Sequence, residues 1–72
     1  MKLRRVKSSA VKAVGYDPER GWLEVRWIGQ ARVYRYSGVA AEVYEELLQA
    51  ESIGAYVNER VKPHYLYEIV QG

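Results

Sequence analysis

Two short strand-forming segments flank a glycine, and their spacing constrains the fold more than any other feature of the sequence. Residues 23–27 alternate apolar and charged side chains, as a half-buried strand does, and residues 33–36 are rich in β-branched and aromatic types. Gly29 and Gln30 lie between them, and glycine at the first position of a two-residue loop is typical of a type II′ hairpin turn. We therefore expect an antiparallel hairpin that turns at Gly29 and Gln30.

The two-residue loop sets the register of this hairpin, because a slip of one residue would turn every side chain to the other face. In this register Tyr34 and Tyr36 share one face with Leu23, Val25 and Trp27. This face is apolar and should be buried. We expect both tyrosine rings to lie in the core.

The opposite face of the hairpin is charged and mixed. The register sets Glu24 against Arg35 and Arg26 against Val33, which suits a surface in contact with solvent. Trp22 falls on this face just after a turn. Trp22 is therefore a better candidate for an exposed aromatic side chain than Tyr34 or Tyr36.

A third strand precedes the hairpin. Asp17 opens a turn, proline follows it, and Gly21 can adopt the left-handed conformation, so residues 18–21 read as a four-residue loop. The loop pairs Tyr16 with Leu23 and continues the apolar face onto residues 10–16. The three strands form an antiparallel meander.

Apolar side chains recur at helical spacing twice in the second half of the chain. The first set is Val43, Tyr44, Leu47 and Leu48, and the second is Ile53, Tyr56, Val57 and Val61. Ser52 can cap the second helix, and Pro63 should end it because Lys62, the residue before proline, is disfavoured in the helical region.

The expected architecture is an α+β fold: a three-stranded antiparallel meander covered on one face by two helices, with N- and C-terminal strands as its potential extensions. Residues 64–70 favour a strand whose partner cannot be read from the sequence. The chain of 72 residues shows no repeat or linker, so residues 1–72 form one domain.

Several classes of protein are disfavoured by what the chain lacks. It has no cysteine, and His64 is its only histidine, so a disulfide framework, a thiol nucleophile and a zinc site have no ligands to draw on. Ser8 and Ser9 lack a visible catalytic base and suit turn or capping roles. We expect a non-enzymatic protein without metal or cofactor. The longest apolar run is three residues, which favours a cytoplasmic location and no membrane contact.

Charge is distributed unevenly along the chain. Residues 1–12 hold five cations and no acid, whereas residues 42–51 hold four glutamates and no base. The basic end could grip phosphates, or its charges could protect an edge strand from aggregation. Both readings stay open.

Several short motifs occur in an order that resembles the KTSC domain. They are Ser8-Ser9, Val14-Gly15-Tyr16-Asp17-Pro18, Leu23-Glu24-Val25 and Val33-Tyr34-Arg35-Tyr36, followed by Val43-Tyr44, Leu47-Leu48, Ala50, Ser52, Gly54, Tyr56, Asn58 and Tyr65. This is a short module named for its occurrence at the C-terminus of some lysyl-tRNA synthetases, and it also occurs as a stand-alone bacterial protein. The resemblance covers nearly the whole chain.

The resemblance assigns motif positions to four residues. Tyr34 and Tyr36 match the family's tyrosine-x-tyrosine motif, and Tyr56 with Asn58 matches its aromatic and asparagine element. We expect all four to be structural, with Asn58 bonded to a loop carbonyl. Ala40 departs from the family, which often has proline at the start of this helix, and Val57 stands where phenylalanine is common.

Two functions remain open. The first is a nucleic-acid-binding module, which the synthetase context suggests for single-stranded or transfer RNA. The residues predicted to bind it are Arg4, Arg5, Lys7, Arg26 and Arg35. The alternative is a protein–protein interaction or self-assembly module that binds another protein or itself. The thin core favours this alternative, and so do the seven tyrosines and two tryptophans, since aromatic residues are enriched at interfaces.

Overall fold

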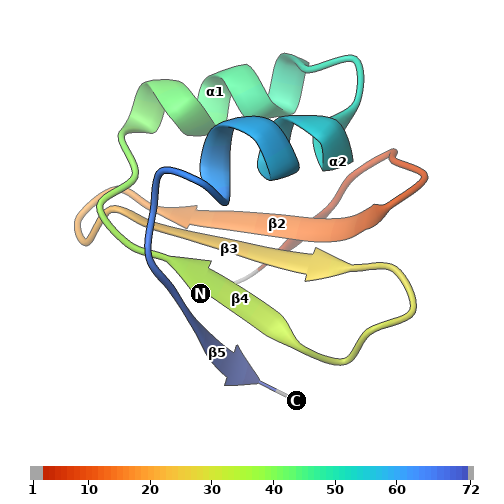
Figure 1. Ribbon diagram of the computed structural model, residues 1–72, viewed down its shortest axis with the longest axis horizontal. Coiled ribbons are helices and arrows are strands. Elements are labelled where there is room, and N and C mark those ends of the chain that lie inside the picture. The colour runs from red at the N-terminus through yellow and green to blue at the C-terminus, as the bar shows by residue number, and fades with distance from the viewer. Residues whose placement is uncertain (1–2, 72) are drawn as a thin grey trace.

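An antiparallel sheet of five strands forms one layer of the molecule, and helices cover one of its faces (Figure 1). The computed structural model describes residues 3–71. The strands are β1 (Arg4–Arg5), β2 (Val11–Asp17), β3 (Trp22–Trp27), β4 (Val33–Tyr36) and β5 (Tyr67–Gln71). The helices are α1 (Ala41–Gln49) and α2 (Ile53–Tyr56), and α2 continues directly into a π-helical turn, η1 (Val57–Val61).

The strands lie in the sheet in the order in which the chain forms them. The predicted α+β architecture is confirmed, and both extensions of the meander are present. The strand-forming segment near the C-terminus finds its partner in β4, where Tyr67 lies opposite Tyr36 and Ile69 opposite Tyr34.

The predicted register of the central strands is confirmed. Leu23 lies opposite Tyr16 on β2 and opposite Tyr36 on β4, and Val25 lies opposite Tyr34. Tyr36 is 1% exposed and belongs to the core, while Tyr34 is half-buried and packs against it.

The turn between β3 and β4 differs from the predicted type II′ turn. The amide of Gln30 donates to the carbonyl of Trp27 over 3.3 Å, so Ile28 and Gly29 are the central residues. Gly29 has a φ of 81° at the second central position, as in a type II turn. Strand pairing ends at Arg26, and residues 28–32 form a longer loop around the same register.

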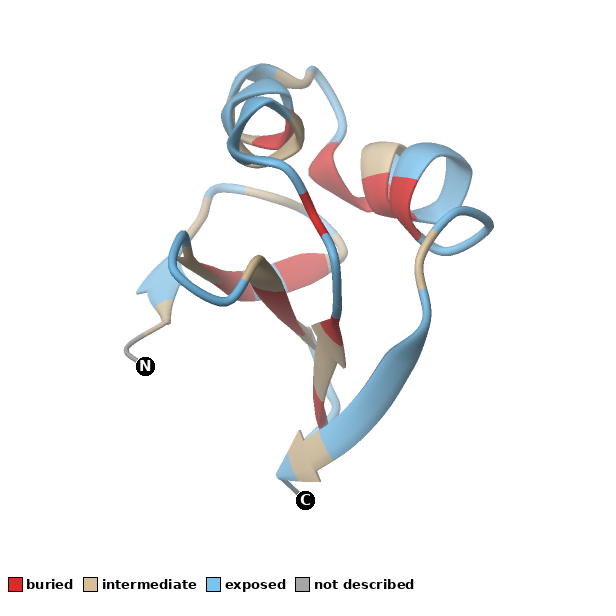
Figure 2. Ribbon diagram, turned by 90° about the vertical axis from the view of Figure 1, so that its left-hand side faces the viewer, coloured by how far each residue is buried: buried red, intermediate tan, exposed pale blue. Residues whose placement is uncertain are grey.

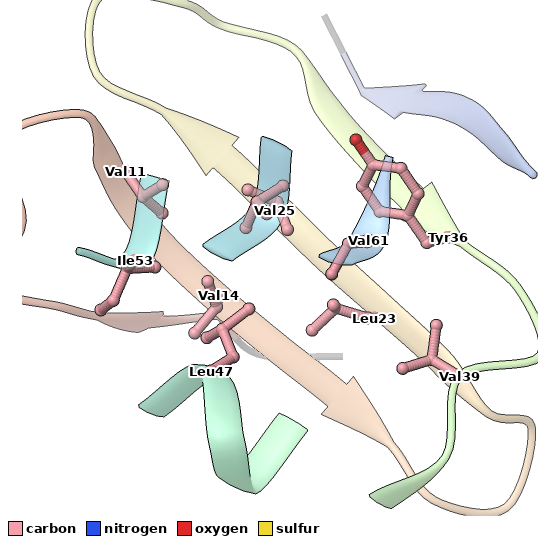
Figure 3. Close-up of a cluster of buried hydrophobic side chains, with 10 residues drawn as sticks. Val11, Val14, Leu23, Val25, Tyr36, Val39, Leu47, Ile53 and Val61 are labelled. Carbon is pink, nitrogen blue, oxygen red and sulfur yellow. The ribbon is translucent and has the colours of Figure 1, made fainter. Parts of the chain in front are cut away.

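The core lies between the sheet and the helices (Figure 2). Leu47 of α1 and Val61 of η1 reach the same apolar layer as Leu23 of β3 (Figure 3). Tyr16 closes one end, because its ring stacks on Tyr44 with a centroid distance of 5.2 Å. The Tyr16 hydroxyl donates to the carbonyl of Val39 over 2.6 Å.

The helix ends follow local chemistry with one correction. Ser52 caps α2 as predicted, since its Oγ accepts from the amide of Ala55 over 3.2 Å. Helix α1 begins at Ala41, and the residue before it, Ala40, supplies no side-chain cap. Lys62 stays in the helical region, contrary to expectation, because its amide bonds to Val57 and its ammonium lies 4.8 Å from the centre of the Trp27 ring. Over residues 3–71, no helix has the length and apolar surface that crossing a membrane requires.

Removal of the Tyr36 ring should cost much of the stability of the fold. The substitution Tyr36→Ala leaves a cavity in a thin core, and we expect the free energy of unfolding to fall by about 3 to 5 kcal/mol. Tyr36→Phe keeps the ring, so its free energy of unfolding should fall far less. Denaturant unfolding of both variants measures the difference. Similar losses of stability in the two would show that packing of the ring does not account for the contribution of Tyr36.

Stability should also fall at alkaline pH through Tyr36. Burial, with contributions from Tyr34 and Tyr67, raises the pKa of Tyr36 to about 12. The unfolded chain loses the Tyr36 proton near pH 10, whereas the folded chain keeps it to higher pH. The buried hydroxyl's contribution to the free energy of unfolding is therefore complete below about pH 10 and is lost as the pH approaches 12. Denaturation of wild type and Tyr36→Phe across this range should show the steeper loss in wild type, and parallel losses would contradict the assignment.

Candidate nucleic-acid interface

The N-terminal segment brings two of the predicted arginines into one row. Strand β1 pairs with β2 so that Arg5 lies opposite Ala13, and Ala13 in turn lies opposite Arg26. Directly opposed residues share a face, so Arg5 and Arg26 both lie on the face without helices, called the open face below. Their Cα atoms are two strand spacings apart, about 10 Å.

A β-bulge shapes the chain between β1 and β2. Val11 lies opposite Trp27 but Ala13 lies opposite Arg26, so Lys12 is the extra residue and is exposed. Ser8 holds the preceding turn, because its Oγ accepts from the amide of Val11 over 3.1 Å and from that of the residue before it. The turn role expected for this serine is confirmed.

A shallow cleft of about 400 Å³ lies between this segment and the β3–β4 loop. We call it the basic cleft, and its main lining residues are Arg5, Lys7, Ser8, Lys12, Ile28 and Gly29. No acidic side chain is among the described residues that line it. Ile28 is 52% exposed and supplies an apolar surface beside the three cations. The cleft can therefore accept an anionic group next to an apolar one.

The cations of this region have no acidic partner in the part of the chain that the structure describes. The ion pairs among residues 3–71 involve only Arg20 and Arg35. Arg5, Lys7 and Lys12 are exposed, and the Nε atom of Arg26 is buried without a hydrogen-bond partner among the described residues. A bound anion would find these charges uncompensated.

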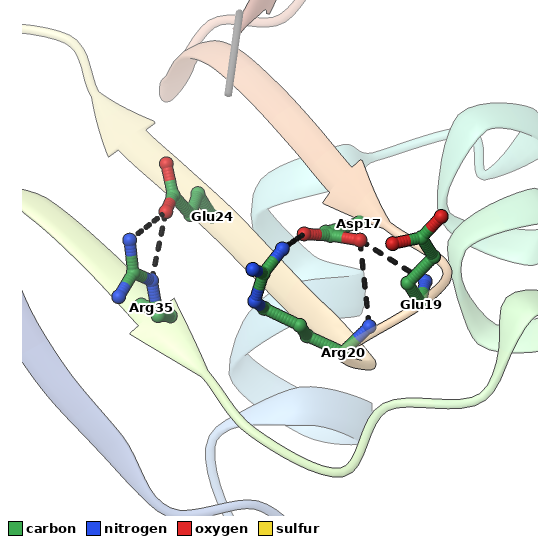
Figure 4. A network of polar contacts seen from close by, with 5 residues as sticks. All are labelled: Asp17, Glu19, Arg20, Glu24 and Arg35. Carbon is green, nitrogen blue, oxygen red and sulfur yellow. Dashed lines mark hydrogen bonds and ion pairs between the residues drawn. The ribbon is translucent and has the colours of Figure 1, made fainter.

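Arg35 is engaged elsewhere on the open face. Its Nε and Nη2 atoms each lie 2.8 Å from Oε2 of Glu24 (Figure 4). Its Nη1 lies 3.4 Å from Oε1 of Glu68. The guanidinium also lies 3.8 Å from the centre of the Trp22 ring. Three contacts hold Arg35, so its charge is largely compensated within the chain.

The open face is less exposed than the sequence predicted. Glu24 is 5% exposed and Val33 is 2% exposed, although no helix covers them. For Glu24 the reason is the guanidinium of Arg35 lying against its carboxylate. Trp22, expected to be exposed, is half-buried, with Arg20 as well as Arg35 over its ring.

The turn at Asp17 is a second polar network at the end of this face. The Oδ1 of Asp17 accepts from the amides of Glu19 and Arg20, and its Oδ2 lies 3.0 Å from the guanidinium of Arg20 (Figure 4). The hydrogen bond from Arg20 lowers the pKa of the Asp17 carboxyl. The network keeps Arg20 at the turn and beside Trp22.

The five predicted binding residues therefore separate in space. Arg5 and Lys7 line the basic cleft, and Arg26 extends its charge along the open face. Arg4 lies opposite Val14 and so alternates to the other face of the edge strand. Arg35 lies outside the group.

Lys12 and Ile28 line the cleft but were not predicted. The sequence held a signal for Lys12, since the apolar residues Val11, Ala13 and Val14 cannot share one face of a regular strand. No comparable signal marked Ile28, whose exposure depends on the longer β3–β4 loop.

The aromatic and asparagine element lies away from the cleft, on the helical layer. The Tyr56 hydroxyl donates to Oε1 of Glu46 over 2.8 Å and links α2 to α1. Burial and this hydrogen bond raise the pKa of Tyr56 to about 12. Asn58 is exposed on η1, and the loop-carbonyl bond expected of it is not among the hydrogen bonds of the described residues.

Acidic side chains gather on the helical layer. A second shallow cleft, of about 430 Å³, is lined by Glu46, Glu51 and Glu59 together with Arg60. Negative charge gathers on the helical side, and it approaches the basic cleft at one end, because Glu51 lines a further cleft together with Lys7 and Ser8. Within residues 3–71, no group of three histidine, aspartate or glutamate side chains is placed to hold a metal ion.

Comparisons with known proteins identify one family and two similar proteins. The model of the KTSC domain matches residues 7–65. An uncharacterised protein of Stutzerimonas stutzeri is 44% identical over 68 residues, which are 93% of this chain and 94% of that protein. A protein of Tsukamurella paurometabola is 46% identical over 63 residues, which are 88% of this chain and 92% of that protein.

A solved structure gives the same result. The crystal structure of a KTSC domain protein from Yersinia pestis superposes with a TM-score of 0.89 at 28% identity, covering 96% of both chains. The family model begins at Lys7, so it includes Lys12 and leaves out Arg4 and Arg5.

The buried ion pair of the open face should matter more than the exposed one. Glu24→Gln removes the charge that compensates Arg35, and we expect the free energy of unfolding to fall by about 1.5 to 3 kcal/mol. Asp17→Asn is the matched control, because it makes the same change in the exposed pair with Arg20 and should have a much smaller effect. Denaturant unfolding compares the two variants. Equal losses of stability would show that burial does not make the Glu24–Arg35 pair more important than the Asp17–Arg20 pair.

Proposed function

The chain belongs to the KTSC domain family, and we propose that it binds single-stranded RNA, including unpaired segments of transfer RNA, weakly and with little sequence preference. The basic cleft is the proposed site, with Arg5, Lys7 and Lys12 contacting phosphates and Arg26 continuing the track onto the open face. The protein acts as a binding module and not as an enzyme. Its proposed setting is the bacterial cytoplasm.

The observation that carries this proposal is the uncompensated charge of the basic cleft. Three cations line one shallow cleft with no acidic residue in its described lining, and none of the three makes an ion pair within residues 3–71. Phosphates bound by such cations release condensed counterions, which drives association. Glutamates concentrate on the helical side, with Glu51 near Lys7, and no described glutamate lines the basic cleft itself.

Low sequence preference follows from the aromatic side chains. Sequence-specific recognition of single strands relies on bases stacked on open aromatic rings and read at their edges. No aromatic side chain is among the described residues that line the basic cleft, Tyr36 is buried, and two guanidinium groups lie over Trp22. Ile28 can contact a sugar or a base, but it has no hydrogen-bonding side chain to read one. Phosphate contacts should therefore dominate the affinity.

Affinity should fall steeply with salt. Each phosphate neutralised on a single strand contributes about −0.7 to the slope of log affinity against log salt concentration, so three contacts give a slope of about −2. Binding would then be clear at low salt and weak near physiological salt. A tethered second binding domain would raise the effective affinity.

Fluorescence anisotropy with labelled oligonucleotides tests the proposal. Arg5→Glu and Lys12→Glu should each weaken binding at low salt by about tenfold or more and make the salt slope shallower. Arg60→Glu is the matched control, since Arg60 is an exposed cation on η1 among glutamates and its reversal changes the net charge equally. It should leave affinity close to wild type.

Two results would overturn the proposal. One is the absence of binding at low salt. The other is an equal loss of affinity in Arg60→Glu and Arg5→Glu, which would indicate attraction by net charge without a site. Either result would favour the alternative role in protein–protein interaction.

A further inference from the structure

The edge strand β5 exposes apolar side chains on a surface that none of residues 3–71 covers. Tyr67 is 59% exposed and Ile69 is 48% exposed, and Leu66, just before the strand, is 87% exposed. The strand lies at the margin of the sheet, beyond the layer that the helices cover (Figure 2). These are three of the four large apolar side chains that are most exposed among the described residues.

The free edge of β5 also presents unpaired backbone groups. The amide of Ser37 donates to the carbonyl of Leu66 over 3.0 Å, which places the backbone of Leu66 toward β4. In an antiparallel ladder inward and outward residues alternate, so the amide and carbonyl groups of Tyr67 and Ile69 point away from β4. The outward backbone groups thus belong to the residues with exposed apolar side chains.

The two edges of the sheet are protected differently. Strand β1 has two residues, Arg4 and Arg5, and both are charged and exposed, which is a common protection against edge pairing. Strand β5 has five residues and one charge, Glu68, which lies 3.4 Å from Arg35 of its own chain. Of the two edges, β5 offers the one whose charge is already compensated, over the regular stretch from Tyr67 to Ile69 that precedes a bulge at Val70.

We propose that β5 pairs with β5 of a second copy of this chain, antiparallel and across a two-fold axis through Ile69. A bulge at Val70 ends the regular part of the strand, because Tyr34 lies opposite Ile69 while the next residue, Val33, lies opposite Gln71. Ile69 is therefore the last residue of the regular part, and this register sets it opposite its own counterpart. The two sheets join into one, and the exposed apolar side chains of both copies cover one another.

Charge selects both this partner and this register. Pairing of β5 with β1 of another copy would build an open chain of molecules through a short, strongly basic edge, whereas pairing with β5 closes after two copies. A register centred on Glu68 would set two carboxylates opposite each other, which is destabilising. Centring on Ile69 moves each Glu68 away from its counterpart and keeps it beside Arg35.

This inference is independent of the proposed RNA binding. The basic cleft lies at the β1 edge and β5 lies at the opposite edge, so each surface can be altered alone. Loss of one property with the other intact would identify which proposal fails.

Sedimentation equilibrium of the full chain, from micromolar to millimolar concentration, tests the dimer. Wild type should shift from monomer to dimer, and Ile69→Lys should weaken dimerisation by about tenfold or more by placing a charge on the free edge. Ile28→Lys is the matched control, because Ile28 is a similarly exposed isoleucine remote from β5, and it should dimerise as wild type does. Circular dichroism confirms that both variants fold. A monomer at all concentrations, or a dimer that survives Ile69→Lys, would overturn the proposal.

Disulfide trapping tests the register. The chain has no cysteine, so Ile69→Cys introduces a single thiol. Opposed residues in a hydrogen-bonded antiparallel pair have Cα atoms about 5.5 Å apart, within the range that a disulfide spans. Ile69→Cys should form a covalent dimer in a glutathione redox buffer much faster than Ile28→Cys. Equal rates would rule out an axis through Ile69.

Discussion

The pairing of β3 with both of its neighbours is the constraint on which the rest of the structure depends. Val25 lies between Val14 of β2 and Tyr34 of β4, and this row sets the face of every residue in the three strands. A slip of one residue would bring Glu24 under the helices and turn Leu23 away from them. The apolar core, the Glu24–Arg35 contact and the row of open-face cations all follow from one register.

The size of the chain explains why the chemistry lies at the edges of the sheet. A chain of 72 residues buries a smaller fraction of its surface on folding than a larger domain does, and its core consists mainly of valine and leucine with one large ring, Tyr36. The interior leaves no room for a polar site. Long cations at one edge and apolar residues at the other are the features that remain available for binding, and the helices supply the negative charge between them.

Local signals predicted most of the fold, and the misses arise from one local ambiguity and from contacts between distant segments. Alternation and loop length predicted the register, because period-two patterns allow few alternatives. The turn type was wrong because Gly29 can supply positive φ in either kind of turn without changing the register. Arg35 was assigned to the binding surface although the register set Glu24 against it, and its further contact with Glu68 joins residues 33 positions apart, on a strand whose partner the sequence did not reveal. The basic cleft depends similarly on a bulge and a loop that bring distant segments together.

The strand order of the sheet bears on how the molecule folds and opens. Each strand pairs only with its neighbours along the chain, so β2, β3 and β4 can form by successive hairpins, with little entropy lost in closing long loops. Strands β1 and β5 each have one neighbour and can detach without breaking a central pairing. Slow hydrogen exchange would therefore be confined to the middle of the sheet, while both edges open by local fluctuations that leave the core intact.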